Sequence, residues 1–383
     1  MFDTISLAQL QQLWWLIISV IGAFFVFLSF VQGGQSQLNA VARNELEKSL
    51  VINSLGRKWE LTFTTLVLFG GALFAAFPLF YATSFGGAYW VWIAILFTFV
   101  LQAVSFEFRK KPGNLLGAKT YESFLFINGT IGILLLGIAL ATFFSGSSFQ
   151  LDDYNHVLWQ HPLLGLEAAL SFFNVSFGIF LVFLSRTLGA LYLLNNIDFR
   201  LQLVKDMEKR LRRSVTTNLA GSIPFLLFFM VSLTSREGFA LNPETGEIFM
   251  ESGKYMKNLQ AMPGVLGMLA AGLLLVILGA AVARRPSNRS GIWFSGPGSI
   301  LVALALFLTA GFNNTAFYPS TFDINSSLTI HNASSSRYTL TAMGYIALAV
   351  PLVIAYIAYF WRKMDRGKIT TGEVSDFSAK EIY

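Results

Sequence analysis

The sequence contains no cysteine and only three histidines. Without cysteine, the chain cannot form a disulfide, a thiolate-ligated haem, a c-type haem attachment or an iron–sulfur cluster. His156 and His161 fall in NHVLWQHP, and His331 falls in LTIHNASSS, both between apolar segments. A haem b buried in a membrane normally needs an axial histidine at membrane depth. The sequence therefore predicts that this chain ligates neither a metal nor a haem.

Charge is also scarce, since only 13% of the residues are charged, whereas 54% are hydrophobic and the mean hydropathy is +0.59. This composition excludes a soluble domain. A helix needs about 20 mostly apolar residues to cross a bilayer. Nine such stretches predict an all-α polytopic membrane protein; they cover residues 12–32, 61–83, 88–105, 121–144, 162–190, 217–234, 263–283, 292–312 and 339–361.

The basic residues alternate between the two sides of these spans. Of the 27 Lys and Arg residues, 23 fall in the odd-numbered connections and the C-terminal tail. Because basic residues are retained on the cytoplasmic side, this pattern predicts an external N-terminus and a cytoplasmic C-terminus. The basic segment 200–213 then needs no nucleic acid, because a juxtamembrane helix facing anionic lipid explains it. The first apolar run lacks a positive n-region, and we expect a retained helix instead of a signal peptide.

Two segments of the chain are similar to each other. FVFLSFVQGGQSQLNA at 25–40 and LVFLSRTLGALYLLNN at 181–196 share the spacing of Ser29/Ser185 and Gly33/Gly189. The match predicts two pseudo-repeated four-helix units, 1–150 and 151–312, followed by an external loop, a ninth helix and a cytoplasmic tail over 313–383.

Within the predicted spans, Glu167 is the one ionisable residue away from an end. An ion-coupled transporter would carry more such groups at mid-membrane, often beside broken helices. The external segment 239–256 has strand-like flanks around Pro-Glu-Thr-Gly, which predicts a hairpin. Pro78, Pro224 and Pro351 lie inside spans and are expected to kink them.

Several separate motifs resemble one known family. INSLGRKWE at 52–60, GGALFAAFPLFYATSFGGAYW at 70–90, the pair Trp14–Trp15 and the block YPS…NSSLTIHNASSSRYTL at 318–340 resemble subunit II of the cytochrome bd ubiquinol oxidases. The resemblance covers essentially the whole chain.

This resemblance implies a respiratory-chain oxidoreductase complex of the bacterial inner membrane, which oxidises quinol and reduces oxygen to water. In that family, haems b and d and the quinol-binding loop belong to subunit I, the expected partner, while subunit II is haemless and carries no catalytic residue. A small accessory subunit and the choice between ubiquinol and menaquinol stay open.

The resemblance also gives three residues a role. Glu60, which on sequence alone is an ordinary solvated charge at a helix start, corresponds to an acid proposed to feed protons from the cytoplasm. Tyr383 corresponds to a C-terminal tyrosine at the same entrance. Trp59 contacts a quinone tail or anchors the helix at the membrane interface, and the anchor is the default for tryptophan.

This chain departs from the family at SFVQGG, 29–34, where many members carry a DGFDMG-like motif. Ser29 and Gln32 stand where acids are expected, so no proton or quinone role transfers to them. Gln32, Gln35 and Gly33–Gly34 instead favour close helix contact. Two other classes remain open, a proton-coupled transporter and a purely structural or assembly subunit.

Overall fold

The structure is a computed structural model that describes residues 4–111, 113–365 and 367–372. Within these residues, nine helical segments are long and apolar enough to cross a membrane, as the sequence predicts. They are Leu7–Gln35, Glu45–Ala76, Tyr89–Phe108, Ala118–Ser145, Phe172–Asn196, Gln202–Ser235, Pro263–Arg284, Ile292–Gly311 and Arg337–Met364.

Most of these spans contain more than one helical element. The elements are α1 (Leu7–Leu28), α2 (Phe30–Gln35), α3 (Leu38–Val41), α4 (Glu45–Gly56), α5 (Trp59–Ala76), α6 (Pro78–Tyr81), η2 (Ala82–Gly87), α7 (Tyr89–Phe108), α8 (Ala118–Ile127), η3 (Asn128–Gly132), α9 (Ile133–Ser145), η4 (Leu166–Leu170), α10 (Phe172–Asn196), η5 (Gln202–Val204), α11 (Lys205–Ser235), α12 (Lys254–Ala261), α13 (Pro263–Arg284), α14 (Ile292–Gly311), η6 (Ile324–Ser326), α15 (Arg337–Ala347) and α16 (Val350–Met364).

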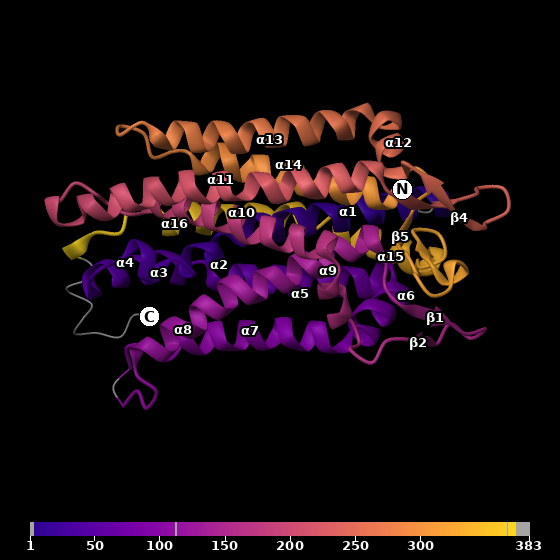
Figure 1. The fold of residues 1–383 in the computed structure, drawn as a ribbon, viewed down its shortest axis with the longest axis horizontal. Helices are drawn as coiled ribbons and strands as arrows, with labels where there is room; N and C mark the ends of the chain where they lie inside the picture. The colour runs from indigo at the N-terminus through magenta and orange to yellow at the C-terminus, as the bar shows by residue number, and fades with distance from the viewer. Residues whose placement is uncertain (1–3, 112, 366, 373–383) are drawn as a thin grey trace.

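The long helices run side by side along the longest axis of the molecule (Figure 1). Three two-stranded antiparallel sheets gather at one end, which we call the hairpin end. The opposite end carries α3, α4 and the last turn of α16, and we call it the basic end. The sheets pair β1 (Phe149–Leu151) with β2 (Val157–Trp159), β3 (Glu237–Leu241) with β4 (Ile248–Ser252), and β5 (Ala316–Tyr318) with β6 (Leu328–Thr329).

The predicted hairpin in 239–256 is confirmed by β3 and β4, which are joined by a turn containing Pro243–Gly246. The other two sheets were not predicted, so the expectation of an all-α protein is correct only for the membrane-length segments. Short strands in connections carry a weak sequence signal because each has only two or three residues.

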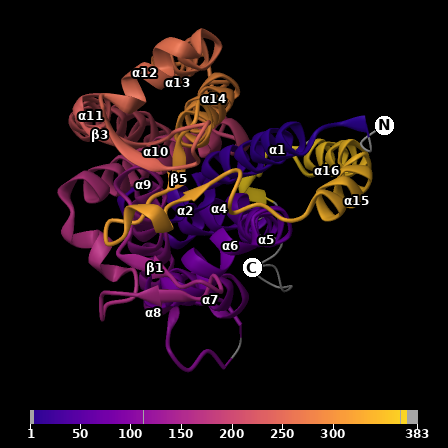
Figure 2. The same ribbon diagram turned by 90° about the vertical axis from the view of Figure 1, so that its right-hand side faces the viewer.

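Helix α10 lies at the centre of the bundle, beside α1, α2, α9 and α11 (Figure 2). It crosses α2 so closely that a methyl group at Gly33 would lie 1.9 Å from the carbonyl oxygen of Ser185. A methyl group at Gly189 would likewise lie 2.2 Å from the amide nitrogen of Gly34. The close helix contact expected at Gly33–Gly34 is thereby confirmed. These contacts are reciprocal, as a two-fold relation would produce, although the division into two four-helix units stays a prediction.

The fifth span is displaced from its predicted bounds. It was expected at 162–190, but α10 begins at Phe172, after the short 3-10 helix η4. Gly165, which has a φ of 99°, precedes η4 and prevents a continuous helix there. Glu167 therefore lies in the connection at the hairpin end, and the prediction that it belongs to the fifth span is wrong. Since α10 continues to Asn196, Arg186 lies inside this span.

The three prolines act differently. Pro78 begins the short helix α6 directly after Phe77, where the second span has ended at Ala76. Pro351 lies in the first turn of α16, after a break between α15 and α16 in the ninth span. Pro224, in contrast, lies inside the continuous helix α11. The first two prolines therefore lie at the start of a new helix, where proline is tolerated.

Candidate functional site

The predicted residues Trp59 and Glu60 begin helix α5 at the basic end. The half-buried indole of Trp59 stacks on Phe106, with ring centroids 5.8 Å apart and planes 7° apart. Its Nε1 is buried and has no acceptor among the described residues. Glu60 is exposed, and its carboxylate belongs to no ion pair within the described chain. The structure thus places the two residues together but in different environments. Tyr383 lies outside the described residues.

The residue before Trp59 is a buried cation. The side chain of Lys58 has no exposed surface, and its Nζ lies 3.1 Å from Oδ1 of Asp365. The same Nζ lies 4.7 Å from the centroid of the Trp361 ring. The amine is therefore held by a carboxylate and by an aromatic face that both come from the end of α16. This arrangement fixes the first turn of α5, and with it the position of Glu60.

The chain that follows α16 is tied to the end of α10. Asn196 donates to Oδ1 of Asp365 at 3.2 Å and accepts from the hydroxyl of Ser54 at 2.7 Å. The backbone of Ile369 donates to Asn196 at 3.0 Å and accepts from Asp198 at 3.0 Å. The ninth span is consequently locked to the second and fifth spans at the basic end, directly beside the start of α5.

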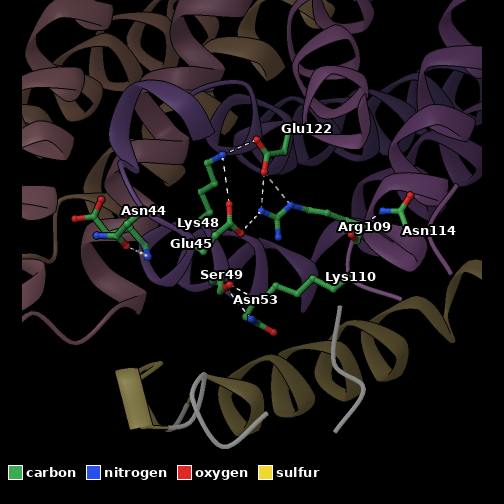
Figure 3. Close-up of polar contacts among 10 residues, drawn as sticks. Asn44, Glu45, Lys48, Ser49, Asn53, Arg109, Lys110, Asn114 and Glu122 are labelled. Carbon is green, nitrogen blue, oxygen red and sulfur yellow. Dashed lines mark hydrogen bonds and ion pairs between the residues drawn. The ribbon is translucent and has the colours of Figure 1, made fainter. Parts of the chain in front are cut away.

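A second charged cluster joins α4, α7 and α8 (Figure 3). Arg109, which is 2% exposed, donates to Glu122 at 2.6 Å and to Glu45 at 2.9 Å. Lys48 donates to the other oxygen of Glu122 at 2.7 Å. Burial, reinforced by the adjacent Arg109 cation, lowers the pKa of Lys110. Two carboxylates thus face three cations, which leaves the cluster with a net positive charge.

A separate chain of neutral side chains joins the same region of α7 and the fourth span to α2. Gln35 donates to the side chain of Asn128 at 2.7 Å and accepts from Gln102 at 2.8 Å. Gln102 in turn accepts from Gln32 at 3.2 Å, and Asn128 donates to Thr98 at 3.2 Å. All five residues are buried, and Oε1 of Gln32 has no donor among the described residues. Gln32 and Gln35 therefore do more than permit close contact: they link α2 to α7 and η3 by hydrogen bonds.

Arg186 lies well inside the fifth span, because α10 continues to Asn196. Its guanidinium donates to the hydroxyl of Ser36 at 3.0 Å and to that of Thr130 at 2.9 Å. No carboxylate among the described residues lies within ion-pair distance of it. The expectation that Glu167 is the one ionisable residue away from a span end is wrong, because α10 extends ten residues beyond Arg186. An ionisable group at this depth is costly and usually marks a functional position.

The titratable residues at the hairpin end have structural partners. Glu167 accepts from the indole of Trp159 at 2.8 Å and from the backbone of Gly165 at 2.7 Å, and His161 lies 3.6 Å away. His156 pairs with Asp152 at 2.8 Å. In residues 4–372, apart from 112 and 366, no group of three or more His, Asp or Glu side chains could hold a metal ion. The carboxylate of Glu167 thus stabilises the connection in which it lies, through its hydrogen bonds to Trp159 and Gly165.

Sequence reasoning missed the Arg109–Glu122 pair, the roles of Gln102 and Asn128, and the depth of Arg186. A polar residue within an apolar run was the available signal for Gln102 and Asn128. Arg186 was passed over because it lies only four residues before the predicted end of the fifth span, at residue 190, and was counted with the basic residues of the connection that follows. Hydrogen bonds between residues about 70 to 90 positions apart have no sequence signature, since only the fold brings such residues together.

Comparisons with known proteins agree with one another. The sequence profile of the family described as "Cytochrome bd terminal oxidase subunit II" matches residues 10–364. The chain is 28% identical over 381 residues to "Cytochrome bd-I ubiquinol oxidase subunit 2" of Escherichia coli K12, covering 95% of this chain and 96% of that protein. It is 26% identical over 366 residues to "Cytochrome bd ubiquinol oxidase subunit 2" of Bacillus subtilis, covering 93% and 97%. In fold, it is similar to a chain of the bd oxidase from Geobacillus thermodenitrificans, with a TM-score of 0.57, 11% identity and coverage of 94% and 98%.

Proposed function

The chain belongs to the cytochrome bd terminal oxidase subunit II family, and from this premise we propose that it is the haemless second subunit of a quinol:oxygen oxidoreductase. The family match over residues 10–364 carries the proposal. The positions of His156, His161 and His331 outside the membrane-length helices support it, because this chain then offers no axial histidine at membrane depth. Haems b and d are assigned to subunit I, the partner, and quinol is the substrate of the complex. Membrane lipids and a small accessory subunit are the other proposed partners of the chain.

The basic end is proposed to face the cytoplasm of a bacterial inner membrane. The connections at this end hold most of the basic residues, and such residues are retained on the cytoplasmic side. Glu60, the Lys58–Asp365 pair and the Arg109–Glu122 pair would then all lie at the cytoplasmic entrance, on the side from which protons are taken up.

Glu60 is proposed to pass protons toward the oxygen-reducing site of the partner. Its exposed carboxylate stands at the head of a face of α5 that continues with Val67, Leu68 and Phe74, which are 56%, 57% and 60% exposed. A carboxylate that stays solvated on an isolated surface cannot deliver protons to a dry site. If the haem-bearing partner covers this face, Glu60 becomes an enclosed titratable group at the subunit boundary.

Two further residues belong to this proposal. Trp59 contacts the partner or a quinone tail through the part of its indole ring that stays exposed at the start of α5. Tyr383 lies beyond the described residues, but the described chain reaches Gly372 after Ile369 is tied to the end of α10 at the basic end. We keep Tyr383 as a second group at the entrance.

The test is Glu60→Gln in the complex purified from its native membrane, with Glu107→Gln as the matched control. Glu107 is an exposed carboxylate of α7 at the same end, paired with Lys111 at 3.3 Å. We expect quinol-driven oxygen uptake to fall at least about tenfold in Glu60→Gln, because proton relays typically contribute factors of 10² or more. The dithionite-reduced minus oxidised haem spectrum should be unchanged.

The alternatives predict other results. A structural or assembly subunit predicts full oxygen uptake in Glu60→Gln and loss of haem bands when the chain is truncated. A proton-coupled transporter is favoured by one observation, the intramembrane Arg186, which has no carboxylate partner among the described residues. It predicts proton-dependent substrate flux by this chain alone, and copurification of haem with a partner would count against it.

A further inference from the structure

A membrane-facing groove separates α11 from α13, which lie on the same side of the bundle in Figures 1 and 2. It encloses a cavity of about 290 Å³, and side chains of α10, α11, α13 and α14 line it. Leu226 and Ile223 form one wall, Leu273 and Ile277 form the other, and Val302 lies on the floor. Ile223 and Ile277 are 49% and 56% exposed, so the groove opens outward along its length.

The groove follows from glycines on the opposite face of α13. A methyl group at Gly272 would lie 2.7 Å from the carbonyl oxygen of Gly298, and one at Gly279 would lie 2.4 Å from that of Gly291. These contacts hold α13 tightly against α14. On the facing side of the groove, α11 presents the small Ala220, which leaves the space between the two helices unfilled.

Cations surround the end of this groove at the basic end. Arg284 lines the cavity, and Arg213 and Arg285 are exposed beside it. Arg212, the neighbour of Arg213, donates to the carbonyl oxygens of Ala283, Arg285 at 2.9 Å, Pro286 at 3.0 Å and Asn288 at 3.1 Å. Residues 283–288 are therefore fixed against α11, the helix that carries Arg213.

The nearby acids do not neutralise these arginines. Glu208 is occupied by Arg212 at 2.6 Å and by Arg289 at 3.0 Å, and Asp206 pairs with Lys209 at 2.9 Å. The connection 284–291 contains no acidic residue. Within the described chain, Arg213, Arg284 and Arg285 form no ion pair, so the mouth of the groove has an unbalanced positive charge.

An apolar groove that ends at unpaired guanidinium groups matches one ligand class. A phosphate ester suits the planar donor fork of arginine, and an acyl chain suits the apolar walls. We propose that this groove is a specific binding site for an anionic phospholipid, with one acyl chain between α11 and α13 and its phosphate at Arg284. A neutral isoprenoid would fill the groove but would leave the guanidinium groups without counter-charge. The proposal does not depend on the oxidase assignment.

The experiment uses the complex in nanodiscs that contain traces of a photoactivatable phospholipid with a diazirine on one acyl chain. The probe has either a phosphatidylglycerol or a phosphatidylcholine headgroup, and the cross-linked peptides are identified by mass spectrometry. Arg284→Gln removes the charge, and Ala220→Leu fills the groove. The matched controls are Arg43→Gln, an exposed arginine of another connection, and Ala271→Leu, an exposed alanine of α13 outside the cavity lining.

In the unmodified complex, we expect peptides spanning 216–226 and 273–277 to be labelled at least about fivefold more by phosphatidylglycerol than by phosphatidylcholine. Arg284→Gln should abolish this preference, Ala220→Leu should reduce labelling by both probes, and neither control should change it. Equal labelling by the two headgroups would overturn the anionic specificity. Labelling no stronger than on the exposed face of α7, or unchanged in Ala220→Leu, would overturn the site itself.

Discussion

Replacing Asp365 by asparagine should leave the ammonium group of Lys58 without a counter-ion. The substitution keeps the shape of the side chain and its oxygen acceptor, so Asn196 can still donate to position 365. Only the negative charge is lost, and the side chain of Lys58, which has no exposed surface, would keep its charge without a counter-ion. Removing one partner of a buried ion pair costs roughly 3–5 kcal/mol. Because Asp365 is 19% exposed and Trp361 still covers the amine, we expect about 3 kcal/mol, the lower end of that range.

The double variant Lys58→Met/Asp365→Asn distinguishes two possible causes of the lost stability. One is the cost of a buried charge without a counter-ion, and the other is the loss of the attraction within the ion pair. A buried pair exchanged for uncharged groups is often nearly neutral, so the double variant should lie within about 1 kcal/mol of the unmodified protein. The two substitutions should therefore be coupled by at least about 2 kcal/mol in a double-mutant cycle. Asp198→Asn is the control, since its partner Arg200 is 85% exposed and such pairs contribute about 0–1 kcal/mol.

The assay is the free energy of unfolding of the purified complex in graded denaturing detergent, recorded by tryptophan fluorescence. A cost below about 1 kcal/mol for Asp365→Asn would refute the reasoning, because Lys58 would then lose its proton or find water without penalty. A double variant as unstable as Asp365→Asn alone would refute it equally, since the damage would then lie in the packing of the ninth span.

Two further predictions concern other parts of the bundle. Gly33→Ala should cost more than about 2 kcal/mol of unfolding free energy, as its methyl group would lie 1.9 Å from the Ser185 carbonyl oxygen, whereas Gly71→Ala, with nothing within 4 Å, should be neutral or slightly stabilising. Burial lowers the pKa of His331, so the unfolded chain takes up a proton near pH 6.5 before the folded chain does. The denaturant concentration at the unfolding midpoint should therefore decrease as the pH is lowered from 7.5 to 5.5. This decrease should be smaller in His331→Gln, and an equal decrease in both proteins would contradict the prediction.

The membrane-length helices were predictable because their signal is local. An apolar run of the required length specifies a span, and the alternating basic residues specify which ends lie together. The hairpin at β3 and β4 was predictable for the same reason, since Pro-Glu-Thr-Gly lies between two strand-like segments. The start of the fifth span was misplaced because residues 162–171 are apolar enough to be included in a span but contain Gly165 in a left-handed conformation. Hydropathy records composition and takes no account of backbone conformation.

The site was less predictable because its partners are distant in sequence. Lys58 was recognised as basic, but nothing in the sequence pairs it with Asp365, 307 positions later. Glutamines in the first span suggested close packing, whereas the structure shows them in hydrogen bonds to α7 and η3. Such networks arise because a buried polar group must find a partner, and the fold decides which one.

The buried column from Gln35 to Thr98 limits where a proton route can run. Its members are amides and a hydroxyl, none of which ionises near neutral pH, and the nearby Arg186 stays protonated at any physiological pH. A relay through titratable groups therefore cannot follow this column into the bundle. Glu60 is the unpaired carboxylate at the start of α5, and it lies on the outside of the described chain. If this subunit delivers protons through titratable groups, Glu60 offers a starting point on its surface, and the partner would supply groups further along the path.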